Sequence, residues 1–144
     1  MEETMKGKRV FQFFCVVVLC VATTHGVAGQ VEEKAVEAAE SWLALVDAGE
    51  YGKSWEESAQ LFRGALGKEK WEQSMRAVRK PLGDVASRKV QSAEYAASLP
   101  GAPDGEYVVV RFGTSFTNKK VAVETVTPMK DPDGAWRVSG YYIK

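Results

Sequence analysis

The sequence predicts an α+β fold in which three N-terminal helices pack on a bent antiparallel sheet of about four strands. Apolar residues recur at helical spacing through residues 31–80, whereas they alternate at strand spacing through residues 106–143. No strand pattern separates the helices, so the sheet is predicted to be antiparallel, with the helices on one of its faces. A strongly bent sheet wrapped on helices forms a cone with an open mouth.

A targeting segment precedes this domain. Residues 1–29 combine a basic start, an apolar run over residues 10–22 and small residues at their end, which is the pattern of a signal peptide. The apolar run is shorter than the roughly twenty residues that a transmembrane helix needs. We therefore expect cleavage near Ala28 or Gly29 and a periplasmic or secreted protein, with an inner-membrane anchor as the alternative. Residues 30–144 are predicted to form a single α+β domain.

The chemistry open to this domain is restricted by its composition. Cys15, Cys20 and His25 all lie in the predicted leader, so residues 30–144 contain neither cysteine nor histidine. This excludes a thiol nucleophile, a disulfide framework, a Ser-His-Asp triad and a zinc site of the usual nitrogen or sulfur type. We expect no metal and no cofactor. The chain has 19 basic and 19 acidic residues, a balance that gives no reason to expect a nucleic-acid partner.

Three amphipathic helices are predicted in the first half of the domain, each with one buried tryptophan. The helices are Val31–Ala48 with Trp42, Tyr51–Phe62 with Trp55, and Lys68–Lys80 with Trp71. Large aromatic side chains at helical spacing belong more often to a core than to a binding surface. We expect the third helix to bury Trp71, Met75 and Val78. It should end before Pro81, since proline disfavours a helical conformation in the residue ahead of it.

Basic residues gather around the end of the third helix. They are Arg76, Arg79 and Lys80, followed after a turn by Arg88 and Lys89. Guanidinium groups that converge in this way suit a carboxylate or phosphate ligand. Cations are also favoured at a helix C-terminus, and Arg76 lies four residues after a glutamate with which it can pair. We interpret the cluster as a solvated helix end, with an anion site as the alternative.

The second half of the domain has the pattern of an antiparallel meander. The predicted strands are residues 87–97, 106–116, 121–129 and 136–143. The second alternates most clearly, with an apolar core face and a half-polar face that carries Arg111. The turn at Pro132-Asp133-Gly134 has the residues that a tight turn prefers, and it leads into the final strand. There Val138 and Tyr142 share one face, and Tyr141 lies on the other.

A set of aromatic, glycine and proline residues spread over the domain matches a known pattern. The set consists of Trp42, Asp47, Gly49, Tyr51, Ser54-Trp55, Phe62 and Trp71, then Leu99-Pro100-Gly101, Pro103-Asp104-Gly105 and Tyr107, and finally Asp133-Gly134, Trp136-Arg137-Val138 and Gly140-Tyr141-Tyr142-Ile143. With these residues the chain resembles the bacterial domain-of-unknown-function 4019 family over nearly the whole domain. The resemblance implies a cystatin-like or nuclear-transport-factor-2-like fold and export in Gram-negative bacteria. It implies no activity, because folds of this kind host both enzymes and binding modules.

The function we expect is that of a small non-catalytic ligand-binding module of the cell envelope. A small apolar or amphipathic ligand would lie in the mouth of the cone. The candidate binding residues are Tyr51, Trp55, Arg111, Glu124 and Tyr141. The alternative is a protein interaction or dimerisation domain that pairs through its sheet with a second copy or with an envelope protein, since the strand at 136–143 is rich in aromatic residues.

A carboxylate and tyrosine enzyme is the third hypothesis. Glu124, if buried, has the chemistry of a general base, and Tyr141 that of a donor to a developing oxyanion. The interpretation we favour is instead that Glu124 and Arg111 form a cross-strand ion pair, which contributes about 0.2–1 kcal/mol. The sequence contains no nucleophile elbow, phosphate-binding glycine loop or HExxH motif. We therefore assign no catalytic residue.

Overall fold

The computed structural model describes residues 27–144, which form four helices followed by four strands. The elements are α1 (Val27–Asp47), α2 (Tyr51–Glu56), α3 (Gln60–Ala65), α4 (Lys68–Leu82), β1 (Val85–Ala96), β2 (Tyr107–Phe116), β3 (Lys119–Lys130) and β4 (Trp136–Ile143). The α+β class and the order of helices before strands are confirmed. Most of the expected signal peptide lies outside the described residues, and its predicted cleavage position falls in the first turn of α1.

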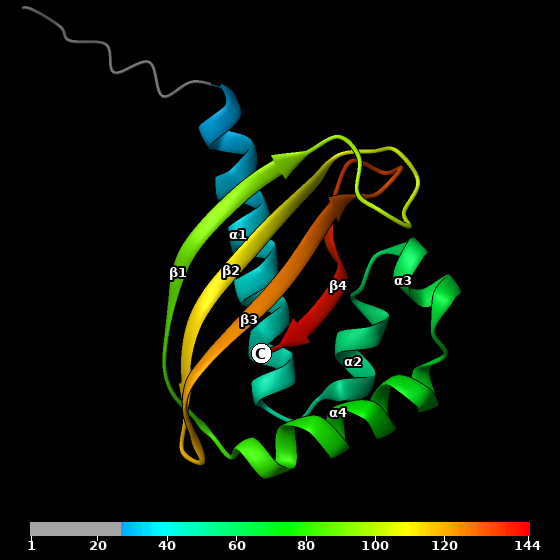
Figure 1. Ribbon diagram of the computed structural model, residues 1–144. Helices are drawn as coiled ribbons and strands as arrows, with labels where there is room; N and C mark the ends of the chain where they lie inside the picture. Colours follow the sequence, from blue (N-terminus) through cyan, green and yellow to red (C-terminus); the bar gives the residue numbers. More distant parts are fainter. Residues whose placement is uncertain (1–26) are drawn as a thin grey trace, which may run out of the picture.

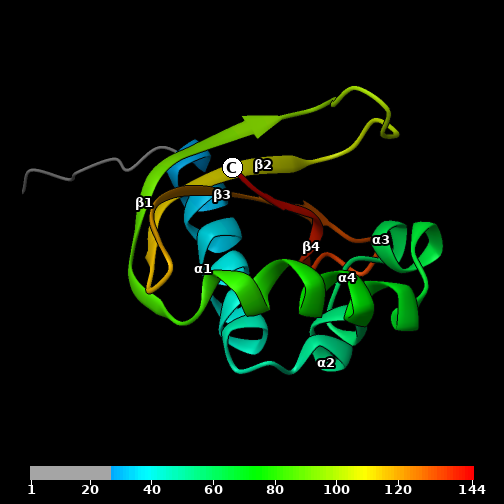
Figure 2. The same ribbon diagram turned by 60° about the horizontal axis from the view of Figure 1, so that its bottom comes forward.

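The sheet is an antiparallel meander that bends around the first helix. Its strands lie in the order β1-β2-β3-β4, each paired with its neighbour in the chain. Figure 1 shows α1 behind the bent sheet, and Figure 2 shows α2, α3 and α4 on that same side. The sheet therefore has an inner face that packs on helices and an outer face that the helices leave uncovered.

The predicted second helix is in fact two short helices. α2 ends at Glu56 and α3 begins at Gln60. Between them Ala59 is fully buried, and its backbone N–H donates to the carbonyl oxygen of Val138 in β4 at 2.8 Å. A residue inside a continuous helix would donate to the carbonyl four residues earlier. The prediction of one helix was wrong here because the N–H group of Ala59 donates to β4 and is not available for a helical hydrogen bond.

The buried stripe of α4 differs from the predicted one at its end. Trp71 and Met75 are buried as expected, but the next buried residue is Arg79, whereas Val78 is 43% exposed. The stripe thus follows a strict four-residue spacing. The helix also passes through Pro81 and ends at Leu82, so the predicted end was wrong by two residues. The missing N–H of Pro81 falls in the last turn, where it removes a single hydrogen bond.

The core is built around an aromatic cluster between α1 and the sheet. Trp42 and Trp71 are 3% and 4% exposed, which confirms their predicted burial. The Trp42 ring lies 5.7 Å from that of Trp71 and 5.3 Å from that of Tyr141 in β4, measured between centroids. Phe112 of β2 and Val126 of β3 complete the contact from the middle of the sheet. The inner face is therefore filled by side chains of its own domain.

A bulge in β4 places Tyr141 on this inner face. Thr127 pairs with Gly140 and Pro128 with Val138, so Ser139 is an extra residue in β4. Pro128 has no N–H to offer to a regular ladder, and a bulge reverses the alternation of the residues that follow it. Val138 and Tyr141 are both in contact with the core as a result. The strict alternation predicted for this strand was wrong from Ser139 onward.

A glycine that ends α4 gives a testable prediction about the connection to β1. Gly83 has a φ of 74°, and a Cβ placed there would lie 2.0 Å from the hydroxyl oxygen of Thr117. That oxygen accepts a hydrogen bond from the backbone N–H of Asp84 at 3.1 Å, so it is held in place. Gly101 has a φ of 77° but no atom within 4 Å of such a Cβ.

We expect Gly101→Ala to lower the free energy of unfolding by about 1–2 kcal/mol, the strain of a left-handed residue that carries a Cβ. Gly83→Ala should cost at least about 1 kcal/mol more, because Gly83 also has a ψ of −160°, a combination that almost only glycine adopts, and the clash adds to that strain. Urea unfolding of the two variants measures both values. Equal losses would show that the Thr117 side chain moves aside without cost.

Candidate functional site

A fully buried carboxylate lies on the inner face of β3. Glu124 is 0% exposed. Its Oε1 atom accepts two hydrogen bonds, one from Nε of Arg88 at 2.7 Å and one from the hydroxyl of Thr114 at 2.6 Å. Its Oε2 atom accepts a hydrogen bond from the hydroxyl of Tyr141. Both carboxylate oxygens therefore have donors, and the negative charge has a guanidinium partner, as a buried charge requires.

The ion pairs continue from the sheet into the helices. Arg88 of β1 also donates to both carboxylate oxygens of Asp47, at 2.6 and 3.0 Å, and Nη2 of Arg79 donates to Asp47 at 2.8 Å. Asp47 is the last residue of α1, and Arg79 lies near the end of α4. Two carboxylates and two guanidinium groups thus alternate from β3 through β1 and α1 to α4. We call these four residues and the two hydroxyl donors the buried polar network, in which Asp47, with a side chain that is 29% exposed, is the member nearest the solvent.

The surroundings of this network shift the pKa values of two of its groups in opposite directions. Burial alone would raise the pKa of Asp47, but hydrogen bonds from Arg88 and Arg79 and the charges of both outweigh it, so the pKa is lowered. Burial, followed by the neighbouring charge of Glu124, raises the pKa of the Tyr141 hydroxyl far above its usual value. Tyr141 is therefore a protonated donor at neutral pH, and Asp47 is an ionised acceptor.

These contacts fix the position of the Glu124 carboxylate within the fold. Glu124 is sealed between the sheet and the helices, and its oxygens are already bonded. The cross-strand pair with Arg111 that the sequence suggested does not form. Glu124 lies opposite Phe112 in the ladder, whereas Arg111 lies on the outer face and donates to Glu94 of β1 at 3.0 Å.

The lowered pKa of Asp47 predicts how this part of the network responds to acid. The folded pKa lies below the value of 3.8 expected in an unfolded chain. The ionised Asp47 therefore stabilises the fold above about pH 4, and this contribution is lost as the pH falls through the folded pKa. The unmodified protein should have a higher free energy of unfolding than Asp47→Asn, and we expect this difference to be largest at neutral pH. The difference should shrink below about pH 4.

Urea unfolding of both proteins between pH 7 and about pH 3 checks this prediction. All other carboxyl groups are common to the two proteins, so the difference isolates Asp47. A difference that stays constant over this range would mean that the Asp47 carboxylate gains nothing from its two arginines.

A cleft opens where α1 ends, beside the second half of α4. It has a volume of about 520 Å³. Its lining comes from the end of α1 and the turn after it, from the start of α2 and from the end of α4: Val46, Asp47, Ala48, Gly49, Tyr51, Arg76, Arg79, Lys80, Gly83 and Asp84. A smaller hollow of about 360 Å³ lies between α1, α2 and β4, with Trp42, Leu45 and Trp136 among its lining residues.

Arg79 joins the cleft to the buried polar network. Its side chain is 5% exposed. Its guanidinium carbon lies 5.1 Å from the centroid of the Phe116 ring, and its Nη2 is bonded to Asp47. Nε and Nη1 of Arg79 are buried and donate to no atom of the described residues. The prediction of a solvated helix end was therefore wrong for Arg79, and also for Arg88, which is 15% exposed.

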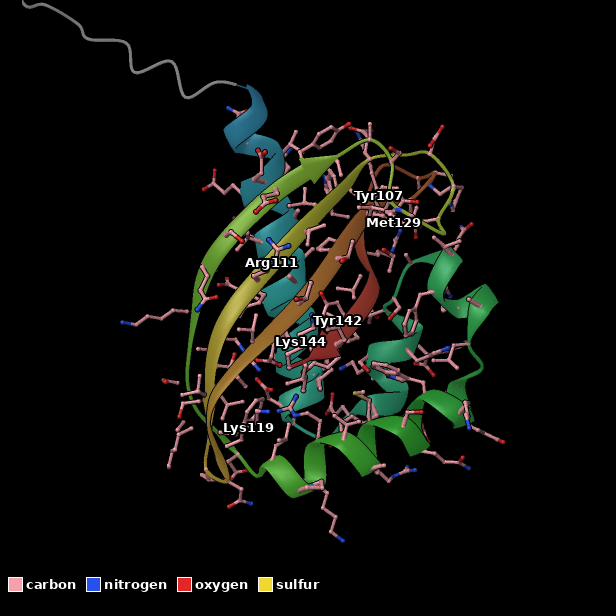
Figure 3. All side chains as sticks on the ribbon, in the orientation of Figure 1. Tyr107, Arg111, Lys119, Met129, Tyr142 and Lys144 are labelled. Carbon is pink, nitrogen blue, oxygen red and sulfur yellow. The ribbon has the colours of Figure 1, made fainter. Side chains whose placement is uncertain are left out.

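The structure brings together only some of the residues expected from the sequence. Glu124 and Tyr141 are hydrogen-bonded to each other on the inner face, and Tyr51 lines the cleft. Trp55 is half-buried, and its indole N–H donates to the carbonyl oxygen of Leu66 at 2.6 Å. Arg111 lies on the outer face (Figure 3), away from the other four.

Several residues of the site were missed or misjudged from the sequence. Asp47 and Thr114 were not considered for it, and Arg79 and Arg88 were assigned to the solvent. One signal was present, because Arg79 continues the four-residue spacing of Trp71 and Met75. No comparable signal links Arg88 to Asp47, since their pairing joins residues 41 positions apart.

Comparison with known proteins identifies a family. The family described as "Protein of unknown function (DUF4019)" has a model that matches residues 38–141 of the chain. No curated protein and no solved structure matches it. Within residues 27–144, no three His, Cys, Asp or Glu side chains gather as metal ligands, and no helix is both long and apolar enough to span a bilayer.

Proposed function

The chain belongs to the DUF4019 family, and we propose that it is a small ligand-binding module of the cell envelope. The ligand occupies the cleft at the end of α1. The observation that carries this proposal is the cleft itself, about 520 Å³ in volume, in which an aromatic side chain, Tyr51, and a buried cation, Arg79, come together from different helices. Pockets for small ligands typically have volumes of about 300–1,000 Å³ and are largely preformed.

On sequence alone we expect the ligand in the mouth of the cone, whereas this proposal places it in the cleft at the end of α1. The inner face of the sheet is occupied by Trp42, Trp71 and Tyr141, which leaves the ligand the space beside them. The bend of the sheet around α1 supports the likeness to cystatin-like and nuclear-transport-factor-2-like cones (Figure 1). The leader at residues 1–29 supports export, with anchoring in the inner membrane as the alternative.

Native mass spectrometry of the protein purified from the envelope of its own host tests the proposal. We expect a mature chain that begins near Gln30 and carries an additional small-molecule mass on each subunit. Tyr51→Ala should lose that mass, because Tyr51 lines the cleft, whereas Tyr142→Ala, at an exposed position of the outer face, should keep it. An envelope extract should also raise the melting temperature of protein made without the ligand. A bare subunit together with an unchanged melting temperature would overturn the proposal.

One observation favours a second candidate function, that of an interaction or dimerisation domain. No helix of residues 27–144 covers the outer face of the sheet (Figure 1), and this face exposes Val121 by 83% and Tyr142 by 50%. Apolar side chains that gather on an uncovered face often mark a protein interface. Sedimentation velocity over a wide concentration range tests self-association. A monomer at every concentration would exclude the homodimer and leave a different envelope protein as the partner.

A further inference from the structure

We infer that the cleft is a site for the carboxylate of a singly charged amphipathic anion, whose oxygens accept hydrogen bonds from Nε and Nη1 of Arg79. This inference rests on the proposed ligand-binding function and specifies the class of ligand. Its starting point is that Arg79 lines the cleft and is 5% exposed, yet these two nitrogens donate to nothing in the described residues. A buried donor without an acceptor is unfavourable, so a ligand that supplies the acceptor gains that interaction on binding.

The guanidinium group of Arg79 is held in place before any ligand arrives. Its Nη2 is bonded to Asp47 at 2.8 Å, and Phe116 lies against it at 5.1 Å from ring centroid to guanidinium carbon. Asp47 is in turn held by Arg88. A ligand therefore does not have to order a flexible side chain, which is a major cost of binding at an exposed arginine. Charge-assisted hydrogen bonds from a fixed guanidinium suit a carboxylate in particular.

The charges around the cleft favour an anion with a single charge. Arg76 and Lys80 line the cleft together with Arg79. Arg76 is partly neutralised by its pair with Glu72 at 3.2 Å. Asp47 and Asp84 also line the cleft, and both α1 and α4 end there, so two carboxylates and the partial negative charges of two helix C-termini face it. This surplus of positive charge is small. It matches a carboxylate better than a doubly charged phosphate.

The rest of the lining defines the other part of the ligand. Ala48 and Tyr51 contribute apolar surface beside the three cations. A hydrocarbon chain or ring attached to the carboxylate would be removed from water against these side chains. A neutral analogue with the same apolar part keeps this apolar contact but lacks the acceptor for Arg79. Comparing the carboxylate with this analogue therefore separates the contribution of the charged group from that of the apolar contact.

Three probes test the inference on the mature protein at constant ionic strength: octanoate, octan-1-ol and inorganic phosphate. Binding is followed through the ¹H–¹⁵N signals of the arginine Nε groups and of the backbone. We expect octanoate to shift the Arg79 Nε signal and the backbone signals around Tyr51 in a saturable way. Octan-1-ol and phosphate should bind at least about tenfold more weakly, the difference expected for one charge-assisted hydrogen-bonded contact.

Variants locate the contact. Arg79→Lys keeps the positive charge but removes both Nε and Nη1, and it should weaken octanoate binding about tenfold. Lys80→Gln, at an exposed position that does not threaten folding, should weaken it about two- to threefold by removing one screened charge. Trp136→Ala alters the smaller hollow between α1 and β4. It should leave octanoate binding unchanged.

The outcomes separate this inference from the function on which it rests. Equal affinities for octanoate and octan-1-ol, with shifts around Tyr51 for both, would overturn the carboxylate site and leave the cleft as a ligand site. Binding that is lost in Trp136→Ala but kept in Arg79→Lys would overturn the inference by moving the ligand to the other hollow. If no probe perturbs the cleft, the carboxylate inference is wrong, while the proposed function is still decided by the mass retained on the envelope-purified protein.

Discussion

Replacing Arg88 with methionine should lower the free energy of unfolding by about 3–5 kcal/mol, the cost of breaking a buried ion pair by removing one partner. Glu124 would keep only its two hydroxyl donors, from Thr114 and Tyr141, and its charge would stay in a fully buried position. Asp47 would also lose two of its hydrogen bonds. Methionine retains much of the side-chain volume, so the loss reports on charge more than on packing.

Arg111→Met is the matched control for this prediction. Arg111 lies on the neighbouring strand and forms a single ion pair with Glu94, in which the two side chains are 42% and 65% exposed. Exposed pairs contribute about 0–1 kcal/mol, so we expect a loss within that range. Adding Glu124→Gln to Arg88→Met should recover part of the larger loss, since it removes the unpaired charge. Similar losses in Arg88→Met and Arg111→Met would contradict a buried ionic role for Glu124.

Trp42→Ala should be comparably destabilising, by about 3–5 kcal/mol, because it leaves a large cavity at the centre of the domain. Its indole N–H donates to the carbonyl oxygen of Ser54 at 2.8 Å and to the hydroxyl of Ser58 at 3.0 Å. Its ring packs against Trp71 and Tyr141. Trp42→Phe loses the donor but keeps one aromatic ring in place, so it should cost less than Trp42→Ala. Urea unfolding followed by far-ultraviolet circular dichroism measures both variants.

Tyr142→Ala serves as the control on the opposite face of the same sheet. Tyr142 is 50% exposed, and substitutions at exposed positions usually change stability by no more than about 0.5 kcal/mol. The result also bears on the second candidate function. A cost that rises with protein concentration would mean that Tyr142 is covered in a dimer, since dimer stability depends on concentration.

The sequence predicted the fold class because periodicity reports directly on burial. The alternation of β2 identified its inner residues correctly, from Val108 to Phe116, and all of these are buried. The same alternation had placed Arg111 on the other face, so a pair with Glu124 required Glu124 to face outward. β3 has apolar residues on both of its faces, and its pattern therefore does not show which of them is buried.

The features that the sequence did not predict depend on contacts between distant residues. The interruption between α2 and α3 exists because Ala59 bonds to Val138, 79 positions later. The inward position of Tyr141 depends on one extra residue, Ser139, opposite Pro128. The burial of Arg79 and Arg88 depends on Asp47, which lies at the end of a different helix. Local sequence patterns do not show which distant residues will be in contact.

The packing of α1 against β4 has a consequence for the order in which the chain assembles. Trp42 belongs to the first element and Tyr141 to the last, and their rings are 5.3 Å apart. As the protein is synthesised, the apolar stripe of α1 emerges well before its partner strand β4. Contacts this distant in sequence slow folding, because a long loop must close before they form. A ribosome-bound chain that stops before Trp136 lacks β4 and should therefore remain unfolded and available to chaperones, because the core closes only when β4 is added.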